Sequence, residues 1–314
     1  MQQIAAINSR IKLEDVSALL SKEIKGDFSS KEYLDAVLAD AEVIFGLRLP
    51  ENIITRSHKL RWIQSMSAGV EAILDKSLVD SSVVVTTMRG IHAIPIGECV
   101  LGLMLMFVKH SPSYFELKRK KQWKPIIPAV LHSKTVGIVG MGSIGQEVAR
   151  LAKAFGMKVI ATRRSTKKTT RATDVDVMLP RTGLYQLLSE SDFVVLTLPL
   201  TAETNKLIAE KELRAMKSTA YLINVARGNV VDEEMLIRAL EDGWVAGAGL
   251  DVFATEPLPA ESTLWELPNV IFTPHITGNM ADYNMQATRL FCENLSRYLD
   301  GRKLLNAVDK KKGY

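Results

Sequence analysis

The sequence predicts an α/β protein of two domains, the larger built on a Rossmann-type doubly wound parallel sheet. The chain has 314 residues, which is long enough for two domains of roughly 150 residues each. From about Thr135 onward, short apolar runs alternate with segments of helical periodicity, a pattern typical of βαβ units. The segment Gly140–Gly145 joins one such run to one such helical segment and has glycine at its first, third and sixth positions.

The expected strands of the larger domain are almost continuously apolar, as parallel strands buried on both faces are. Ser143–Phe155 follows the first strand with apolar residues at helical spacing, and Gly156 ends this helix. Asp232 is suited to cap a helix over Glu233–Glu241. The predicted strands are Thr135–Gly140, Lys158–Thr162, Phe193–Leu198, Ala220–Val225, Ala246–Val252 and Val270–Thr273.

The first hundred residues show a weaker alternation and predict a smaller α/β domain. Ser30–Ala39 has the pattern of a helix, and Asp282–Tyr298 predicts a last helix that crosses back to this domain. Glu98–Lys121 is apolar first and then strongly basic, which fits either a core helix running into an exposed one or a subunit contact. The predicted strands are Gln3–Ile7, Ala41–Phe45, Trp62–Ser65 and Val83–Thr86. We expect residues 1–98 and 282–314 to form the smaller, substrate-binding domain and residues 99–281 the dinucleotide-binding domain.

Composition narrows the function classes. Hydrophobic residues make up 47% of the chain and charged residues 24%, which is ordinary for a folded globular protein. The longest uncharged apolar run, Cys99–Val108, is far shorter than the ~20 residues that cross a bilayer. The first residues also lack the pattern of a secretion signal. We therefore expect a cytoplasmic protein without a membrane partner. The two cysteines, Cys99 and Cys292, match no zinc-site spacing, and no metal is expected. The net charge of +5 raises nucleic-acid binding as a rival function, but the basic clusters are not interleaved with aromatic residues, and no nucleic-acid partner is expected.

The glycine-rich loop indicates a dinucleotide site. Gly140 permits a tight turn, Gly142 lets the backbone approach a pyrophosphate, and Gly145 lets helix and strand pack closely. The N-terminus of the helix then offers free N–H groups to the phosphates. A tight strand–helix turn without any cofactor is the alternative, and the strand–loop–helix context favours the cofactor.

The end of the second strand indicates which nicotinamide cofactor is used. NAD sites place an acidic residue there to bind the ribose 2′-hydroxyl. Here the sequence continues with Arg163, Arg164 and Ser165, and guanidinium groups suit a 2′-phosphate. We therefore expect NADP(H) to be preferred, with NAD(H) possible, although a solvated basic loop is the alternative.

Three further polar residues follow predicted strands of the same sheet. Arg227, Glu256 and His275 each come shortly after a strand, and ligands of such sheets bind beyond the carboxyl ends of the strands. The three side chains could therefore converge on one crevice. Each also has a plain alternative, as a solvated arginine, a surface Glu-Pro turn or a structural histidine.

Together these motifs resemble the D-isomer-specific 2-hydroxyacid dehydrogenase family. The match runs from about Trp62 to Thr277 and includes Ser67-Ala68-Gly69-Val70, the glycine loop, Leu198–Thr204 and the Arg, Glu and His motifs in family order and spacing. The first sixty residues match only loosely. The resemblance implies a fold of two α/β domains with a crevice between them, the smaller domain being flavodoxin-like and discontinuous in sequence.

The resemblance also implies roles in the reduction of a 2-oxo acid. The residue matching His275 donates a proton, the one matching Glu256 holds the imidazole and favours its charged form, and the one matching Arg227 polarises the carbonyl group and contacts the carboxylate. Backbone N–H groups of Ala68 and Gly69 complete the carboxylate site. The other implied cofactor contacts are Ser143 and Ile144 at the pyrophosphate, Pro199 and Thr204 along the crevice, Ala226 near the nicotinamide and Asp251 at its carboxamide. Val225 and Gly278 are also expected to contact the cofactor.

We therefore expect an NADP-dependent D-2-hydroxyacid dehydrogenase, acting as a 2-oxo acid reductase on glyoxylate or hydroxypyruvate. Family members are typically dimers formed through the segment after the first domain, so a homodimer is expected. The departure from the common pattern is Arg163 in place of an acidic residue, which puts NAD use in doubt. A nucleotide-sensing, corepressor-like interaction protein on the same fold is the alternative. Trp62, Met66, Arg89, His92 and Trp265 are candidates for the pocket wall or for plain packing.

Overall fold

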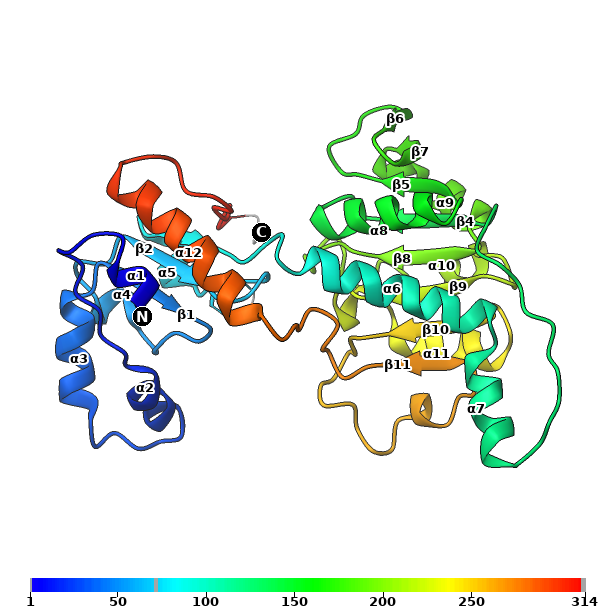
Figure 1. Cartoon of the computed structure of the whole chain (residues 1–314), viewed down its shortest axis with the longest axis horizontal. Coiled ribbons are helices and arrows are strands. Elements are labelled where there is room, and N and C mark those ends of the chain that lie inside the picture. The colour runs from blue at the N-terminus through cyan, green and yellow to red at the C-terminus, as the bar shows by residue number, and fades with distance from the viewer. Residues whose placement is uncertain (1, 71–72, 312–314) are drawn as a thin grey trace. The chain divides into compact units, whose positions relative to one another are not determined.

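The computed structural model describes residues 2–70 and 73–311, which form two compact units (Figure 1). The small unit contains the described residues up to Ile91 and those from Met280 onward, and the large unit is His92–Asn279. The expected boundaries, after residue 98 and before residue 282, differ from these. Residue 98 lies inside one continuous helix, α6 (Ala93–Val108), which belongs wholly to the large unit.

The large unit contains the predicted doubly wound sheet. Its strands lie in the order β11-β10-β9-β8-β4-β5-β7-β6, and every neighbouring pair is parallel except β6 and β7. The chain order reverses between β4 and β8, which is where such sheets bind dinucleotides. All six strands predicted for this region are present. The strands are β4 (Thr135–Val139), β5 (Lys158–Thr162), β6 (Thr170–Ala172), β7 (Val175–Leu179), β8 (Phe193–Leu196), β9 (Tyr221–Asn224), β10 (Gly247–Leu250) and β11 (Val270–Phe272).

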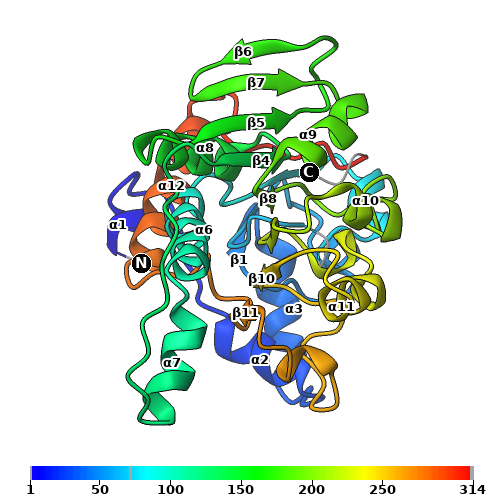
Figure 2. The same cartoon turned by 90° about the vertical axis from the view of Figure 1, so that its right-hand side faces the viewer.

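Two strands at the edge of this sheet, β6 and β7, were not expected from the sequence. Figure 2 shows β7 beside β5, with β6 beyond it at the edge of the sheet. All three residues of β6 are exposed, so it lacks the apolar run of a buried strand. In β7 the apolar run is interrupted by Asp176, whose carboxylate accepts hydrogen bonds from the Lys153 ammonium (3.0 Å) and from the Val159 N–H (2.8 Å).

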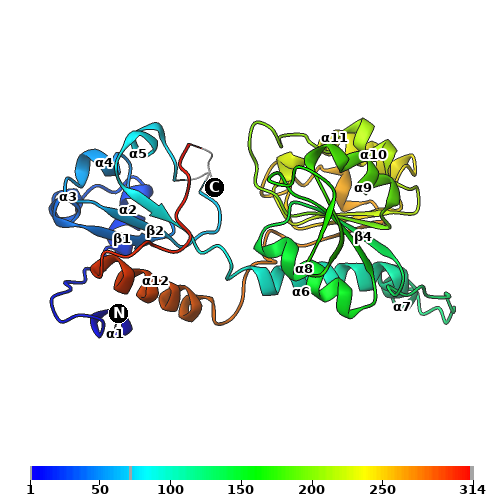
Figure 3. The same cartoon turned by 90° about the horizontal axis from the view of Figure 1, so that it is seen from above.

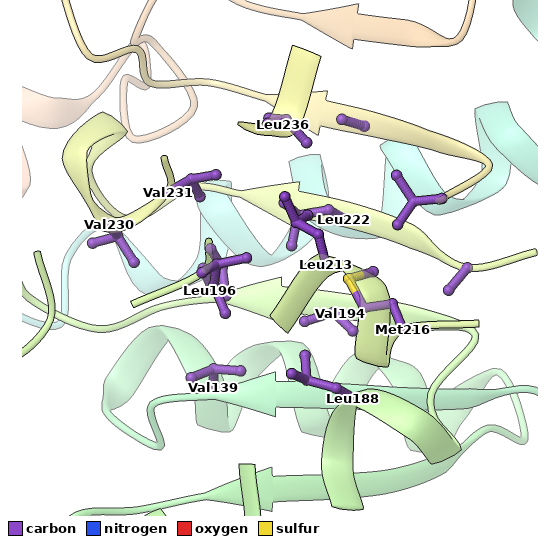
Figure 4. Packing of buried hydrophobic residues seen from close by; sticks show 14 of the residues in the cluster. Val139, Leu188, Val194, Leu196, Leu213, Met216, Leu222, Val230, Val231 and Leu236 are labelled. Atoms are coloured by element: carbon purple, nitrogen blue, oxygen red, sulfur yellow. The ribbon is translucent and has the colours of Figure 1, made fainter. Parts of the chain in front are cut away.

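Helices cover both faces of the large sheet (Figure 3). Successive residues of β8 point to opposite faces, with Val195 packed against α6 and α8 and Val194 against α9, α10 and α11. Figure 4 shows the hydrophobic core between the sheet and the helices α9, α10 and α11. In this core Leu188, Leu213 and Leu236 lie over the strands. The remaining helices are α7 (Ser111–Arg119), α8 (Ser143–Ala154), α9 (Leu184–Glu190), α10 (Glu210–Ala215) and α11 (Glu233–Glu241), and three short 3-10 turns lie at Arg181–Gly183, Gly228–Val230 and Thr263–Trp265.

The small unit is also α/β, with helices on both faces of a parallel sheet in the order β1-β2-β3 (Figure 3). The final helix α12 (Tyr283–Leu299) packs Phe291 and Leu295 against Trp62, whereas α3, α4 and α5 cover the other face. The strand predicted at Gln3–Ile7 is wrong, because Gln2–Ala5 forms a helical turn that buries Ile4 beside Phe291. The other elements are β1 (Val43–Gly46), β2 (Trp62–Ser65), β3 (Val84–Thr86), α1 (Gln2–Ala5), α2 (Ser17–Ile24), α3 (Lys31–Asp40), α4 (Ile53–Arg56) and α5 (Lys76–Asp80).

Within the part of the chain that the structure describes, no single helix is long and apolar enough to cross a membrane. By length and composition alone, the pair α6 and α7, bent by 63° at their junction, passes that test.

Candidate active site

The glycine-rich loop joins β4 to α8, and each of its glycines has a distinct physical reason. Gly140 has a φ of +102°, a conformation that favours glycine. A Cβ on Gly145 would lie 2.5 Å from the Gly140 carbonyl oxygen, so this residue must be small for helix and strand to pack. At Gly142, by contrast, no described heavy atom lies within 4 Å of the Cβ position. The loop thus has open space beside the first N–H groups of α8, those of Ser143 and Ile144, and it fits the pyrophosphate of a dinucleotide.

The loop after β5 carries the cationic side chains expected at the ribose. Arg163, Arg164 and Ser165 are all exposed. The Arg163 N–H donates to the Leu179 carbonyl oxygen at the end of β7 (3.2 Å), and the Thr166 N–H donates to the Arg163 carbonyl oxygen (3.1 Å). The backbone of this loop is therefore fixed against the sheet, while the exposed side chains have room to meet an anionic group.

The loop after β8 is held in shape by its own hydroxyl groups. The Thr204 hydroxyl donates to the Pro199 carbonyl oxygen (2.7 Å) and accepts from the Thr201 N–H (2.7 Å). The Thr197 hydroxyl donates to the Gly140 carbonyl oxygen (2.5 Å), which joins this loop to the glycine-rich loop. Pro199 is exposed, and Thr204 fixes the turn that presents it.

Arg227 follows β9 on a turn shaped by a buried amide. The side chain of Asn224, which is 1% exposed, accepts from the Ala226 N–H (3.0 Å) and donates to the Arg227 carbonyl oxygen (3.0 Å). A Cβ on Gly228 would lie 1.9 Å from the Phe253 carbonyl carbon. The Arg227 turn therefore packs directly against the loop that leads to Glu256, and only glycine allows this approach.

Asp251 organises the loop that carries the histidine. It is 2% exposed, and its carboxylate accepts from the Thr273 hydroxyl (2.6 Å), the Ile276 N–H (2.9 Å) and the Thr277 hydroxyl (2.5 Å). Its backbone carbonyl oxygen accepts from the His275 N–H (2.8 Å). Both carboxylate oxygens are thus engaged within the protein, which gives Asp251 a positioning role that the sequence did not indicate. Contact with a carboxamide remains a prediction.

Glu256 and His275 form an ion pair or charge-assisted hydrogen bond. Oε2 of Glu256 lies 2.7 Å from Nδ1 of His275, and Oε1 accepts from the Phe253 N–H (3.0 Å). His275 has a φ of +53°, uncommon for a residue with a side chain, and its imidazole is 48% exposed. With Nδ1 occupied by the carboxylate, Nε2 is the nitrogen that can exchange a proton with a substrate.

The other predicted substrate contacts lie on the loop after β2 in the small unit. Ala68 is exposed, and within residues 2–70 and 73–311 its N–H has no acceptor. The Gly69 N–H donates to the Ser67 hydroxyl at 3.3 Å. Of the two N–H groups expected to bind a carboxylate, that of Ala68 therefore has no acceptor among these residues. That of Gly69 makes a long hydrogen bond to a neighbouring side chain.

Among the residues named for the pocket wall or for plain packing, Trp62 is a packing residue. It is fully buried, stacks on Phe291 with ring centroids 5.3 Å apart and donates from Nε1 to the Thr86 hydroxyl (2.7 Å). His92 lies against Gly278, where a Cβ would lie 2.9 Å from its Cδ2. Met66 is half-buried, and Arg89 and Trp265 are exposed. Among the described residues, no group of three or more His, Cys, Asp and Glu side chains could hold a metal ion.

Arg227, Glu256 and His275 follow β9, β10 and β11, which are neighbours in the sheet. Their loops therefore share one edge of the large unit, and the acid–base pair is adjacent to a turn that carries a guanidinium group. Asn224, Thr273 and Thr277 were missed by sequence reasoning, because their contacts run to residues that are distant along the chain or to backbone groups. Their position directly beside the predicted site residues is the one sequence signal that points to them.

Comparison with known proteins identifies the family of the chain. The family model for the D-isomer specific 2-hydroxyacid dehydrogenase NAD binding domain matches residues 101–277. A glyoxylate reductase from Thermofilum pendens is 33% identical over 299 residues, covering 92% of this chain and 85% of that protein.

Solved structures show the same fold. A D-isomer specific 2-hydroxyacid dehydrogenase from Xanthobacter autotrophicus Py2, in complex with NADPH and MES, has a TM-score of 0.80 at 31% identity and covers 88% of this chain and 86% of that one. An NADPH-dependent glyoxylate/hydroxypyruvate reductase from Sinorhizobium meliloti, in complex with NADP and sulfate, has a TM-score of 0.77 at 26% identity and covers 94% and 96%. With a family model that matches more than half of its length, the chain belongs to the D-isomer-specific 2-hydroxyacid dehydrogenase family of oxidoreductases.

Proposed function

We propose that this protein is a 2-oxo acid reductase that prefers NADP(H) and forms a D-2-hydroxy acid. The observation that carries the proposal is the 2.7 Å contact between Glu256 and His275 beside the Arg227 turn. This is the acid–base pair that reduction of a carbonyl group to an alcohol requires.

The chain's own residues account for the proton and for orientation. The cofactor, when bound, supplies the hydride chemistry. His275 donates a proton from Nε2 to the carbonyl oxygen of the substrate as negative charge develops there, and the Glu256 carboxylate stabilises the charged imidazole before this transfer. Arg227 presents a planar guanidinium group to the carbonyl oxygen and the carboxylate, a geometry that suits two parallel hydrogen bonds. In the small unit, the Ala68 and Gly69 N–H groups are the donors proposed for the substrate carboxylate.

The preference for NADP(H) rests on the loop after β5. Arg163 and Arg164 are exposed there, and Ser165 adds a hydroxyl group. The segment from Ala161 to Thr170 contains no carboxylate that would bind a ribose 2′-hydroxyl or repel a phosphate. Two proteins of similar fold were solved with NADPH and with NADP, which supports the same preference here.

The favoured substrates are glyoxylate and hydroxypyruvate, since the similar proteins from Thermofilum pendens and Sinorhizobium meliloti are named for them. The test is a panel of 2-oxo acids, including glyoxylate, hydroxypyruvate, pyruvate and 2-oxoglutarate, assayed with NADPH and with NADH. We expect the two small substrates to give the highest kcat/KM with NADPH. No reduction of any panel member would overturn the proposed activity.

We also propose that the small unit binds the substrate and that the large unit binds the dinucleotide. The protein is further proposed to work as a homodimer in the cytoplasm. Support for a dimer comes from α7 and the segment after it. Phe115, Trp123 and Ile127 are 64%, 101% and 91% exposed, a concentration of apolar surface that a monomer rarely leaves uncovered.

A further inference from the structure

The first residue of the last helix contacts the loop after β2. Tyr283 begins α12, and its hydroxyl donates a hydrogen bond to the carbonyl oxygen of Met66. Both residues belong to the small unit, although 217 positions separate them along the chain. Met66 lies between the end of β2 and the Ser67–Gly69 segment. This bond therefore acts at the base of the loop that we assign to the substrate carboxylate.

The Met66 backbone is held from both sides. Its N–H donates to the Gly46 carbonyl oxygen (2.9 Å), which continues the pairing of β1 and β2 by one residue. Its carbonyl oxygen is held by Tyr283. The next residue, Ser67, accepts at its carbonyl oxygen from the Met88 N–H (3.0 Å), and its N–H donates to the Ser65 hydroxyl (3.1 Å). Because these bonds leave the peptides before Ala68 little freedom to rotate, the direction of the Ala68 N–H is set by them.

The tyrosine itself sits on a well-fixed helix. Asn294, about three turns after Tyr283 on the same face of α12, is fully buried and donates to Oε1 of Gln64 in β2 (2.9 Å). Phe291 stacks between Trp62 and Phe45, with ring centroids 5.3 Å and 4.4 Å away. Burial raises the pKa of the Tyr283 hydroxyl, which therefore stays protonated and able to donate.

We propose that Tyr283 is a positioning residue for substrate binding. By holding the Met66 carbonyl group, it fixes the orientation of the Ala68 and Gly69 N–H groups that receive the carboxylate. This inference rests on the proposed function of that loop. Without the hydroxyl, the Met66–Ser67 peptide loses one of its restraints, and the two N–H groups no longer point consistently at one anion. The cost falls on binding of the carboxylate and not on the acid–base pair, which lies in the large unit.

The test is Tyr283→Phe, with Tyr298→Phe as the matched control. Tyr298 lies on the same helix, and its hydroxyl donates to Oε1 of Glu42 (2.5 Å), away from the loop. For Tyr283→Phe we expect KM for the 2-oxo acid to rise about threefold to tenfold, the range for loss of one neutral hydrogen bond, while kcat changes less than about twofold. Inhibition by oxamate, a carboxylate-bearing analogue of the substrate, should weaken by the same factor, and the Kd for NADPH should stay unchanged. Tyr298→Phe should leave all of these values at the wild-type level.

A second measurement needs no turnover. Amide hydrogen exchange of the segment 66–69 should accelerate in Tyr283→Phe and not in Tyr298→Phe. Unchanged exchange would overturn the inference even if the protein reduces 2-oxo acids, and accelerated exchange would support the hold on the loop even if the proposed activity failed. Wild-type KM and oxamate inhibition in Tyr283→Phe, or an equal rise in both variants, would show that the tyrosine serves stability alone.

Discussion

Glu256 uses its two carboxylate oxygens for two different partners: Oε2 lies 2.7 Å from Nδ1 of His275, and Oε1 accepts from the Phe253 N–H at 3.0 Å. The second bond fixes the carboxylate within its own loop, so that the first can orient the imidazole. The side chain of Glu256 is 36% exposed and that of His275 48%, which leaves the pair open to solvent on one side. The contact therefore serves orientation and charge at an accessible site, where a contribution to stability is small.

Glu256→Gln keeps the size of the side chain and removes its charge. The amide offers the imidazole a weaker, uncharged hydrogen bond in place of the 2.7 Å contact with the carboxylate, so the ring is less firmly oriented toward the substrate. We expect kcat for 2-oxo acid reduction to fall about tenfold or more, measured by initial rates with NADPH.

Glu266→Gln is the control for this change, since it alters an exposed glutamate of the same unit. Its reduction rate should match the wild type. If Glu256→Gln also keeps the wild-type rate, the pair has no part in the chemistry.

Arg163→Asp should change the choice of cofactor. It removes a cation that can bind the 2′-phosphate and supplies an acceptor for a ribose 2′-hydroxyl. We expect the ratio of kcat/KM for NADPH over NADH to fall by about 100-fold or more from a wild-type value above 10, because a charge-assisted contact is replaced by repulsion. Arg302→Asp makes the same change of charge in the small unit and should leave the ratio unaltered. A wild-type enzyme that prefers NADH would refute our interpretation of the loop.

Much of the large sheet could be predicted from the sequence, because parallel strands buried on both faces leave continuous apolar runs. β5 was predicted at its observed residues for this reason. The strand β6 could not be predicted, since its three residues are exposed, only Ala172 among them is apolar, and its strand character comes from pairing with β7. The failed strand at Gln3–Ile7 has a similar cause. A short apolar segment fits strand or helix equally well, and the packing of Ile4 against Phe291 decides between them.

The candidate site was predicted as a set of residue types but not as a set of contacts. The glycine pattern predicted both the turn at Gly140 and the close packing at Gly145, since each follows from local backbone geometry. The role of Asp251 could not be predicted in this way. Its partners lie more than 20 positions further along the chain, and two of them are backbone N–H groups that any residue type would supply.

A homodimer should give a mass near 70 kDa by light scattering at micromolar concentration, twice the 34.8 kDa of one chain. Replacing Trp123 and Ile127 together by serine removes two of the most exposed apolar side chains of the segment after α7 and should yield the monomer mass. Phe28→Ser is the control, because Phe28 is also exposed (58%) but lies in the small unit. A wild-type mass of about 35 kDa would exclude the dimer.

Asp251→Ala should separate the positioning of His275 from the chemistry. The substitution leaves the Thr273 and Thr277 hydroxyls and the Ile276 N–H without their buried acceptor, so we expect the free energy of unfolding to fall by about 3 kcal/mol in urea titrations. Asp75→Ala, which removes the N-cap of α5, should lower the free energy of unfolding by about 1 kcal/mol and leave the activity unchanged.

If Asp251 acts by placing His275 against Glu256, then Asp251→Ala should lower kcat roughly tenfold or more, because the acid–base group is misplaced. Adding Glu256→Gln to that variant should then cost little further, since both changes disrupt the same pair. Fully additive losses in the double variant would show that Asp251 and Glu256 act independently, and a weakened Kd for NADPH without loss of stability would instead favour a direct contact between Asp251 and the carboxamide.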